Sequence, residues 1–368
     1  MKVVKFSPIY GNNIGDIAIS KCIEHAFSKY GVTVCSKDLF FREPGSFINK
    51  TKSDSLRIKV STYLQLNFPH FFYILKKIAF RFSNDQNKIR VVSSGFDAVI
   101  FGGGNILMSN LGSDYAYRVS SYCKAIDKKT IIFSAGAGPF PFERKKLTHE
   151  LILNSSFLSV RDKNSLSYFK ELGADESNIM IDPAFIISDL YPKEDCNKKY
   201  LGVNIISNYF NDQELELFAI SVYKFCIEKD LKLKLINTAY PVDPISADKF
   251  RSYILKLNPN MDCIVVNTTL DLSSIECAYR DVQYFLGARM HSLIFALSYG
   301  IPAVGIAWDK KVPAMFEQFL GKKHKDVILG DDLNIGFDVY NQISLEERLD
   351  LTKNNIYNNV EKVIDMFS

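Results

Sequence analysis

The clearest indication of the fold lies between residues 282 and 297, which read Val282-Gln-Tyr-Phe-Leu-Gly-Ala-Arg289-Met-His291-Ser-Leu-Ile-Phe-Ala-Leu297. The apolar run from Val282 to Leu286 is typical of a buried strand, and the apolar run after His291 is typical of a buried helix. A strand that leads directly into a helix is the repeating unit of a parallel α/β sheet. We therefore expect one such unit here, with two cationic-type side chains at its turn.

Arg289 and His291 follow the predicted strand. In an extended segment, residues two apart point to the same side, so both side chains would converge on one ligand while Met290 faces the other way. The helix that we expect to open at about His291 favours a phosphate or carboxylate at its positive end. Arginine matches such an anion with a planar fork, and histidine exchanges a proton near neutral pH. The alternative is that Arg289 pairs with a neighbouring carboxylate and His291 caps the helix.

The same alternation of strand and helix patterns extends over most of the 368 residues, a length that favours two domains. The polar, proline-bearing stretch from Tyr191 to Lys199 is the expected linker. We predict a first α/β domain over residues 1–191 and a second over 200–340, each with a parallel sheet. Residues 344–368 form a helical pattern long enough to reach back to the first domain.

Glycine-rich loops follow two predicted strands of the first domain. The run Ala98–Phe101 leads into Gly102-Gly103-Gly104-Asn105, and the run Ile131–Ser134 leads into Ala135-Gly136-Ala-Gly138-Pro139. Parallel strands end at one edge of the sheet, where open α/β folds bind ligands, so we expect both loops to contact a ligand. The alternative is that the glycines only supply positive φ angles to tight turns.

Three further positions are candidates for the same kind of contact. Arg161 follows a third strand of the first domain, where it contacts a ligand or pairs with Asp162 or Asp182. Asp16 follows the loop Gly11–Gly15, which is neither a dinucleotide fingerprint nor a P-loop, and the alternative is a helix cap. Lys311 lies beside Trp308, whose ring either stacks on a sugar or covers the end of the domain.

Composition excludes several classes of protein. Residues 42–90 hold ten Lys and Arg against three Asp and Glu, a local charge of +7, so the rest of the +4 chain carries about −3 and nucleic-acid binding is not expected. Seven scattered cysteines without a CxxC pair fit reduced thiols in the cytoplasm and predict no metal site. We expect a cytoplasmic protein, because the sequence has no secretory leader and no apolar run near the roughly 18 residues of a membrane span.

The basic segment 42–90 also contains many aromatic residues. Apolar side chains at helical spacing have basic side chains beside them, namely Phe71, Leu75, Ile78 and Phe82 with Lys76, Lys77 and Arg81. This pattern suits an interfacial helix, through which residues 61–82 would make peripheral contact with the inner face of the membrane. The commoner alternative is a buried or interdomain helix with solvated lysines.

Taken in order, several of these stretches resemble motifs of the polysaccharide pyruvyl transferase family. They are Gly15-Asp16-x-Ala18-Ile19, Gly102-Gly-Gly-Asn105, Ala135-Gly-Ala-Gly-Pro139, Ser159-Val-Arg161-Asp162 with Ser165 and Leu172-Gly173, Asp182-Pro183-Ala184-Phe185, and Arg289-Met-His291 followed by Tyr299-Gly-Ile-Pro302. The resemblance runs from about residue 1 to 320 and does not explain residues 42–90.

The resemblance implies a fold like that of the two-domain GT-B glycosyltransferases, with the active site in the cleft and the C-terminal helix crossing over. It also implies a reaction in capsule or exopolysaccharide biosynthesis. The enolpyruvyl group of phosphoenolpyruvate, the donor substrate, becomes a cyclic ketal on two hydroxyls of a polysaccharide or lipid-linked sugar, and phosphate is released. In the family the corresponding residues contact phosphoenolpyruvate, which assigns that contact to Arg161, Arg289 and His291, with the main chain at Met290 beside them.

This reaction gives each candidate residue a role. His291 would protonate the methylene carbon or the leaving phosphate, and Arg161 and Arg289 would hold the anion. Asp16, expected on the opposite domain, would act as general base for the acceptor hydroxyl, and neither a metal nor another cofactor is required. The rival functions are a nucleotide-sugar glycosyltransferase and a non-catalytic receptor for a sugar or an anion. The sequence does not determine the acceptor sugar or the oligomeric state. A homo-oligomer is one of the oligomeric states that it leaves open.

Overall fold

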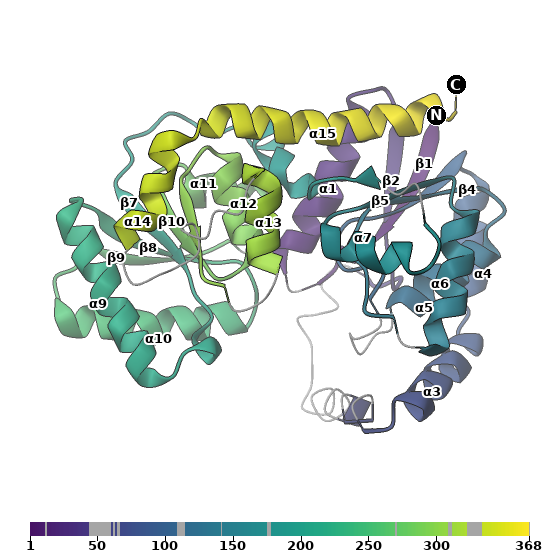
Figure 1. Cartoon of the computed structure of the whole chain (residues 1–368), viewed down its shortest axis with the longest axis horizontal. Helices are drawn as coiled ribbons and strands as arrows, with labels where there is room; N and C mark the ends of the chain where they lie inside the picture. Colours follow the sequence, from purple (N-terminus) through teal and green to yellow (C-terminus); the bar gives the residue numbers. More distant parts are fainter. Residues whose placement is uncertain are drawn as a thin grey trace. The chain divides into compact units, whose positions relative to one another are not determined.

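The computed structural model describes residues 1–11, 13–43, 60–61, 63–64, 67–108, 115–140, 142–174, 178–268, 271–307, 311–321 and 333–367. The chain divides into two compact α/β units (Figure 1). Unit 1 comprises Met1–Gly11, Ile19–Asp182 and Ile356–Ser368, and unit 2 comprises Asn12–Ala18 and Pro183–Asn355. Residues 183–191, which the sequence analysis assigned to the first domain, therefore belong to unit 2.

Unit 1 is built on a six-stranded parallel sheet in the order β2-β1-β3-β4-β5-β6. The strands are β1 (Lys2–Ser7), β2 (Thr33–Asp38), β3 (Ala98–Gly102), β4 (Lys129–Ala135), β5 (Phe157–Val160) and β6 (Asn178–Ile179). Its helices are α1 (Ile14–Ser28, in unit 1 from Ile19), α3 (Pro69–Arg81), α4 (Asp85–Ser94), α5 (Tyr115–Ala125), α6 (Phe142–Asn154) and α7 (Lys163–Lys170). Strand β3 is buried at every position, which is why its sequence is a continuous apolar run without alternation.

Unit 2 is built on a five-stranded parallel sheet in the order β11-β10-β7-β8-β9. The strands are β7 (Tyr200–Asn204), β8 (Lys232–Asn237), β9 (Cys263–Asn267), β10 (Val282–Gly287) and β11 (Ala303–Gly305). Its helices are α8 (Ile187–Leu190), α9 (Asp212–Glu228), α10 (Val242–Leu257), α11 (Ser273–Tyr279), α12 (Met290–Ser298), α13 (Lys311–Leu320) and α14 (Leu333–Asp338). Among the residues that the structure describes, unit 2 also has 3-10 turns at Pro183–Ile186, Ser207–Tyr209 and Val339–Gln342.

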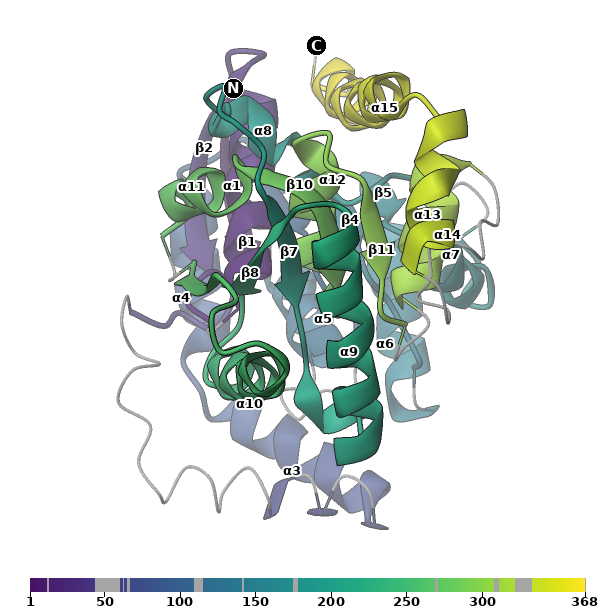
Figure 2. The ribbon, with the colours of Figure 1, turned by 90° about the vertical axis from the view of Figure 1, so that its left-hand side faces the viewer.

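The two units confirm the predicted class of two parallel-sheet α/β domains. Figure 2 shows helices α9 and α10 in front of strands β7 and β8, and their apolar side chains share one buried cluster with these strands. Helix α9 begins with a capping box in which Asn211 and Glu214 exchange hydrogen bonds, which satisfies backbone N–H groups at its first turn. In the described part of the chain, no helix combines the length and the apolar character of a membrane span.

The C-terminal helix α15 (Leu345–Asp365) begins in unit 2 and belongs to unit 1 from Ile356 onward, as expected for a helix that returns to the first domain. Within unit 1 its end is held by polar and aromatic contacts. The hydroxyl of Tyr30 donates to Glu361 at 2.9 Å, and Lys129 Nζ lies 4.5 Å from the ring centre of Phe367.

A lysine is completely buried in the middle of strand β1. Lys5 has no exposed surface, and its Nζ donates to the backbone carbonyl and to the hydroxyl of Ser20 on helix α1. Burial penalises the ammonium form, which lowers the pKa of Lys5 to about 7 despite the favourable charge of Glu24. Lys5 therefore costs folding free energy at neutral pH.

We expect Lys5→Met to raise the free energy of unfolding at pH 7 by about 2 kcal/mol or more, since one pKa unit corresponds to about 1.4 kcal/mol. Between pH 7 and 10.5 the unfolded chain binds a proton at this site more tightly than the folded chain, so wild-type stability rises with pH and the advantage of methionine shrinks. Urea denaturation at pH 7 and pH 10 measures both effects, with Lys37→Met as the exposed control. If wild type and Lys5→Met differed in free energy of unfolding by the same amount at both pH values, the lowered pKa of Lys5 would be contradicted.

Candidate functional site

The turn after strand β10 presents Arg289 at the start of a helix. The strand ends at Gly287, Arg289 occupies the N-cap position with φ −95° and ψ 130°, and helix α12 begins at Met290. The expectation that Arg289 and His291 alternate along an extended segment was therefore wrong, because the chain is already helical at Met290. Arg289 instead lies at the N-cap, and His291 lies in the first turn, of a helix whose free N–H groups favour an anion.

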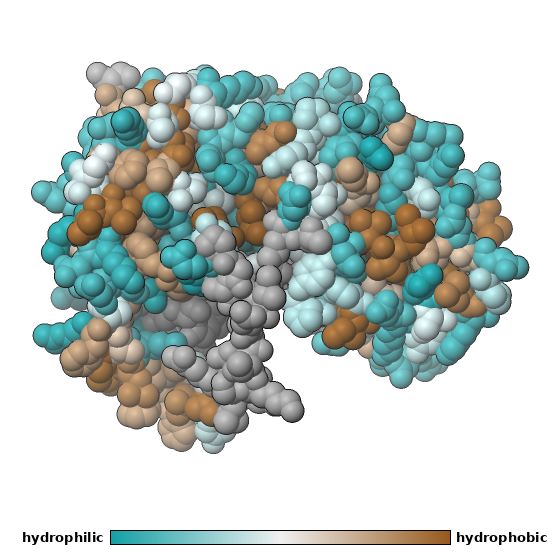
Figure 3. Space-filling model, turned by 180° about the vertical axis from the view of Figure 1, so that it is seen from behind, coloured by the Kyte–Doolittle hydropathy of each residue, from teal (hydrophilic) through white to brown (hydrophobic). Residues whose placement is uncertain are grey.

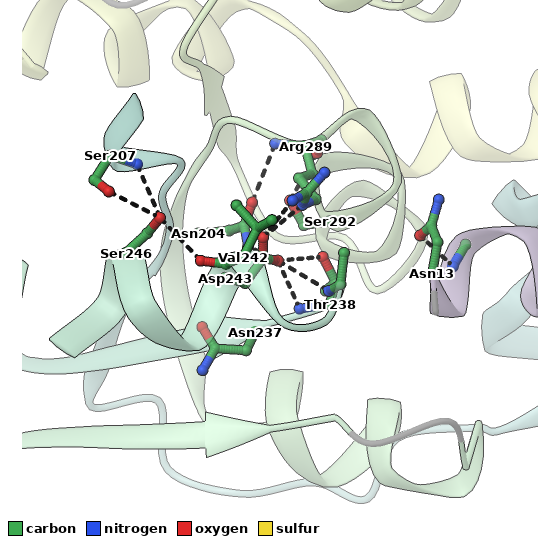
Figure 4. Close-up of polar contacts among 12 residues, drawn as sticks. Asn13, Asn204, Ser207, Asn237, Thr238, Val242, Asp243, Ser246, Arg289 and Ser292 are labelled. Atoms are coloured by element: carbon green, nitrogen blue, oxygen red, sulfur yellow. Dashed lines mark hydrogen bonds and ion pairs between the residues drawn. The ribbon is translucent and has the colours of Figure 1, made fainter. Parts of the chain in front are cut away.

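Arg289 pairs with a buried carboxylate (Figure 4). Its Nε and Nη2 atoms both lie 2.6 Å from Oδ1 of Asp243, and its backbone N–H donates to Oδ1 of Asn204 at 3.1 Å. The ion pair that the sequence left open as an alternative is thus present. The pair holds the Nε edge of the guanidinium, and the side chain is still 24% exposed. Among the described residues, Nη1 has no hydrogen-bond partner in this arrangement.

Asp243 is the most constrained residue of this cluster. Its carboxylate is fully buried, and Oδ2 accepts hydrogen bonds from the backbone N–H of Thr238 at 2.9 Å and of Ala239 at 3.0 Å. The hydroxyl of Thr238 and the amide of Asn204 donate to the same oxygen at 3.2 and 3.1 Å. A buried carboxylate is tolerated only with such donors, and together they fix the position of the oxygen atoms that Arg289 contacts.

These donors come from the carboxyl ends of neighbouring strands. Asn204 ends β7, Thr238 follows β8, and Arg289 follows β10, and these three strands are adjacent in the sheet. Asn204 also donates to the carbonyl of Ile236 at 2.9 Å, which ties β7 to β8 at this edge. The carboxyl edge of the unit 2 sheet is thus held together by a hydrogen-bonded network.

His291 rests against the backbone of Gly15. A Cβ atom built on Gly15 would lie 2.1 Å from Nδ1 of His291, so only glycine leaves room for the imidazole ring in this position. The ring also stacks on Phe295, with centroids 6.4 Å apart. His291 is half-buried, and its orientation is therefore set by contacts on more than one side.

The segment that carries Gly15 and Asp16 belongs to unit 2. The backbone N–H of Ile14 donates to the carbonyl of Thr238 at 3.1 Å, and Asn13 forms an isolated antiparallel bridge with Ala239. Asp16, expected on the opposite domain from His291, therefore lies in the same unit as His291, in the first turn of helix α1. The sequence could not show this, because the strand β1 that precedes the segment belongs to unit 1.

The predicted residues of unit 1 gather around Arg161. This side chain is 6% exposed, its Nη2 donates to Oδ1 of Asn105 at 2.5 Å, and its Nε lies 3.5 Å from Asp162. Its Nη1 lies 3.9 Å from a carboxylate oxygen of Asp182. The structure thus brings Arg161 together with Asn105 of the first glycine loop, and the pairing with both aspartates that the sequence left open is also present.

Gly136 lies directly beside this group. A Cβ atom at Gly136 would stand 2.9 Å from both Nε of Arg161 and Oδ1 of Asn105, and its N–H donates to the carbonyl of Gly104 at 2.8 Å. The two glycine loops are therefore hydrogen-bonded to each other, and Gly136 allows them to approach Arg161 closely.

Other glycines of these loops serve packing as well as turning. Gly103 and Gly138 have φ angles of +77° and +69°. A Cβ atom on Gly103 would lie 2.1 Å from a methyl group of Ile19, and one on Gly138 would lie 2.2 Å from the ring of Tyr168. The alternative of positive φ angles in tight turns thus applies to these two positions and also to Gly104, whose φ is +72°.

The remaining candidates each lie at the first residue of a helix. Met290 is half-buried at the first residue of α12, and Lys311 is exposed at the first residue of α13. Trp308 lies outside the described residues. Within the described ranges, no group of three or more His, Cys, Asp or Glu is placed to hold a metal ion.

Sequence reasoning missed Asp243, Asn204 and Thr238. A signal was available for two of them, since Asn204 ends one apolar run and Thr238 follows another at the edge where ligands bind. Asp243 had none, because an aspartate in the first turn of a helix is ordinarily an exposed residue that interacts with the helix dipole.

A family profile described as polysaccharide pyruvyl transferase matches residues 13–310, most of the chain. The chain belongs to the polysaccharide pyruvyl transferase family. The match spans Gly15, Asn105, Arg161 and the Arg289-Met-His291 turn, so both clusters lie inside it. No curated protein matches this chain.

Solved structures of similar fold include nucleotide-sugar epimerases and a glycosyltransferase. A putative UDP-N-acetylglucosamine 2-epimerase from Listeria monocytogenes has a TM-score of 0.57 and 14% identity, over 99% of this chain and 94% of that one. The UDP-GlcNAc 2-epimerase from Neisseria meningitidis has a TM-score of 0.53 and 11% identity, over 100% and 99%. An alpha-glucosyltransferase solved with UDP and DNA has a TM-score of 0.52 and 10% identity, over 98% of this chain and 95% of that one. At these identities the similarity establishes the GT-B-like fold alone.

We expect Asp243→Asn to lower the free energy of unfolding by about 3 kcal/mol, because it leaves the partly buried Arg289 without its counter-ion and points an amide at several donors. Urea denaturation measures the change. Asp248→Asn on the same helix is the matched control, since Asp248 is exposed, and it should change stability by less than about 0.5 kcal/mol. Equal free energies of unfolding for the two variants would show that the ion pair and hydrogen bonds of Asp243 do not stabilise the fold.

Proposed function

We propose that this polysaccharide pyruvyl transferase uses phosphoenolpyruvate to form a pyruvate ketal on a sugar. The enol carbon gains bonds to two hydroxyl oxygens, the methylene carbon gains a proton, and the bond to the phosphate oxygen breaks. The two sugar hydroxyls lose two protons. One is offset by the proton that the methylene carbon gains when it becomes a methyl group, and the other leaves with phosphate. The observation that carries the proposal is the fixed Arg289 next to His291 at the start of helix α12, inside the region of the family match.

Arg289 is suited to hold the carboxylate or phosphate of the donor. Its Nε edge is held by Asp243, so its orientation is determined before a ligand arrives and less entropy is lost on binding. The first-turn N–H groups of α12 add partial positive charge beside it. Together they stabilise negative charge on the departing phosphate.

His291 is suited to proton transfer. The ring lies against the backbone of Gly15 and stacks on Phe295, which fixes the direction in which a nitrogen can donate or accept. We assign His291 as the acid that protonates the methylene carbon or the leaving phosphate. Asp16, one residue after Gly15 and in the same unit, is the proposed base for an acceptor hydroxyl. Arg161 is the second cation that the family resemblance assigns to the donor.

The proposed acceptor is a sugar of a polysaccharide or of its lipid-linked precursor; the family description supports the polysaccharide. The direct test is incubation of the purified protein with phosphoenolpyruvate and candidate saccharides, followed by phosphate release and by proton NMR of the ketal methyl group. Both signals are expected with the correct acceptor. Turnover of a nucleotide sugar with release of nucleoside diphosphate, and no reaction of phosphoenolpyruvate, would replace the proposal with the glycosyltransferase alternative. Saturable sugar binding without any turnover would indicate a receptor.

His291→Ala should reduce kcat by about 10²–10⁴, the usual contribution of a positioned acid or base. Steady-state phosphate release measures kcat, and circular dichroism checks that the fold is retained. A variant that keeps near wild-type kcat would remove His291 from the proton-transfer role.

Arg289→Lys should also lose activity, because lysine keeps the charge but cannot maintain a planar contact with Asp243 and with an anion at the same time. We expect a loss of phosphoenolpyruvate affinity by at least tenfold in equilibrium binding. Unchanged affinity in this variant would contradict the proposed anion contact.

Gly15→Ala should reduce kcat by at least tenfold although it alters neither charge nor a reacting group, because the new methyl group displaces the His291 ring. Gly95→Ala is the matched control, since a Cβ atom at Gly95 has no atom within 4 Å and its φ is −86°. Two variants with the same kcat would show that the position of the imidazole does not limit the reaction.

A further inference from the structure

Helix α3 carries two apolar faces, and only one of them is buried. Phe72, Tyr73 and Phe80 face the core of unit 1. Phe80 packs edge-on against Tyr117 with centroids 5.6 Å apart, and the guanidinium of Arg144 lies 4.7 Å from the ring centre of Tyr73. The helix is therefore anchored to its unit by these side chains, as the packed-helix alternative required.

The other face of α3 and its flanking residues is apolar and exposed. The exposed side chains have relative accessibilities between 40% and 86% and are Phe68, Phe71, Ile74, Leu75, Ile78 and Phe82. Phe71, Ile74, Ile78 and Phe82 recur at intervals of three and four residues, so they form one stripe. Together with Phe68 and Leu75, these four side chains form what we call the α3 stripe. Figure 3 shows brown side chains gathered at the lower left, where α3 lies.

Within residues 67–84, basic side chains accompany the α3 stripe and acidic ones do not. Lys77 and Arg81 are exposed, and no Asp or Glu occurs between residues 67 and 84. The next acidic residue, Asp85, forms an ion pair with Arg118 at 2.5 Å. Lys76 is half-buried, with Nζ 5.4 Å from the ring centre of Phe72, and therefore belongs to the anchoring side. The exposed face thus combines aromatic and aliphatic bulk with positive charge.

The charge of this face decides what can cover it. A contiguous exposed apolar surface generally marks an interaction site. A symmetric contact between two copies would place the same patch on both subunits and bring Lys77 and Arg81 near their own counterparts, which is repulsive. Lysine is also depleted in protein interfaces. An anionic lipid surface accepts both features, because headgroups attract the cations and the rings enter the boundary between headgroups and acyl chains.

We propose that the α3 stripe, with Lys77 and Arg81, binds the protein to an anionic lipid bilayer. The helix lies in the interface and does not span it, because Phe72, Tyr73 and Phe80 keep its other face on unit 1. The proposal does not depend on the reaction, since its test measures lipid binding without turnover.

The experiment is co-sedimentation of the full chain with vesicles of phosphatidylglycerol and phosphatidylcholine in equal parts, and with pure phosphatidylcholine as reference. We expect wild type to bind the anionic vesicles and to lose at least tenfold in affinity at high salt. Each nearby cation contributes about 1 kcal/mol, so Lys77→Glu/Arg81→Glu should weaken binding at least tenfold. Phe71→Ser/Ile78→Ser should weaken it comparably at low salt, where charge attraction remains.

Matched controls lie on unit 2. Lys224→Glu/Lys256→Glu changes the net charge equally at exposed positions of α9 and α10, and Leu217→Ser/Ile227→Ser removes exposed apolar side chains from α9. Both controls should bind like wild type. Thermal unfolding verifies folding, and Lys77→Gln/Arg81→Gln replaces the charge reversal if that variant unfolds.

Equal vesicle binding by wild type and the α3 variants would overturn the proposal, as would equal binding to pure phosphatidylcholine. Absence of vesicle binding together with a dimer that Phe71→Ser/Ile78→Ser dissociates would assign the stripe to a second copy of the chain. That result would also overturn the proposal.

Discussion

The carboxylate of Asp243 is the constraint on which the edge of unit 2 depends. A charge without exposed surface must be matched by donors, and here they come from the ends of two strands and from a guanidinium. The consequence is reciprocal. The donors fix the carboxylate, and the carboxylate fixes Arg289 at the N-cap of α12. Preorganised charge of this kind is worth more to a reaction than a mobile cation, because no reorganisation is needed when a ligand arrives.

The alternation of apolar runs predicted both sheets, because a strand covered on both faces has to be apolar at nearly every position, as β3 is. It also placed Arg161 with the glycine loops, since β3, β4 and β5 are adjacent and end at one edge. The pairing of Arg289 with Asp243 spans 46 positions and depends on a packing arrangement that no local pattern contains. The assignment of Asp16 to the other domain was wrong for a similar reason. Asp16 follows a strand of unit 1 in the sequence, but backbone contacts of Asn13 and Ile14 with residues 238 and 239 place this segment in unit 2.

The GT-B-like architecture explains why neighbours with different chemistry share this fold. Parallel strands place their carboxyl ends along one edge, and whichever side chains follow the strands determine the ligand. In this chain the residues at these strand ends are Asn204, the last residue of β7, Thr238 after β8 and Arg289 after β10. A polysaccharide pyruvyl transferase and a nucleotide-sugar epimerase can therefore share nearly complete structural coverage at 11% identity.

The discontinuity of unit 2 has a consequence for biosynthesis. Residues 13–18 are translated early, soon after strand β1. The groups that they contact, the carbonyl of Thr238 and the imidazole of His291, emerge from the ribosome only after the part of unit 1 up to Asp182 has been made. Domains generally fold in order from the N-terminus. Strand β1 can therefore join its sheet before Thr238 and His291, which contact the turn after β1, have been synthesised. A polypeptide that stalls before residue 291 contains a complete sheet in unit 1 but no imidazole against Gly15.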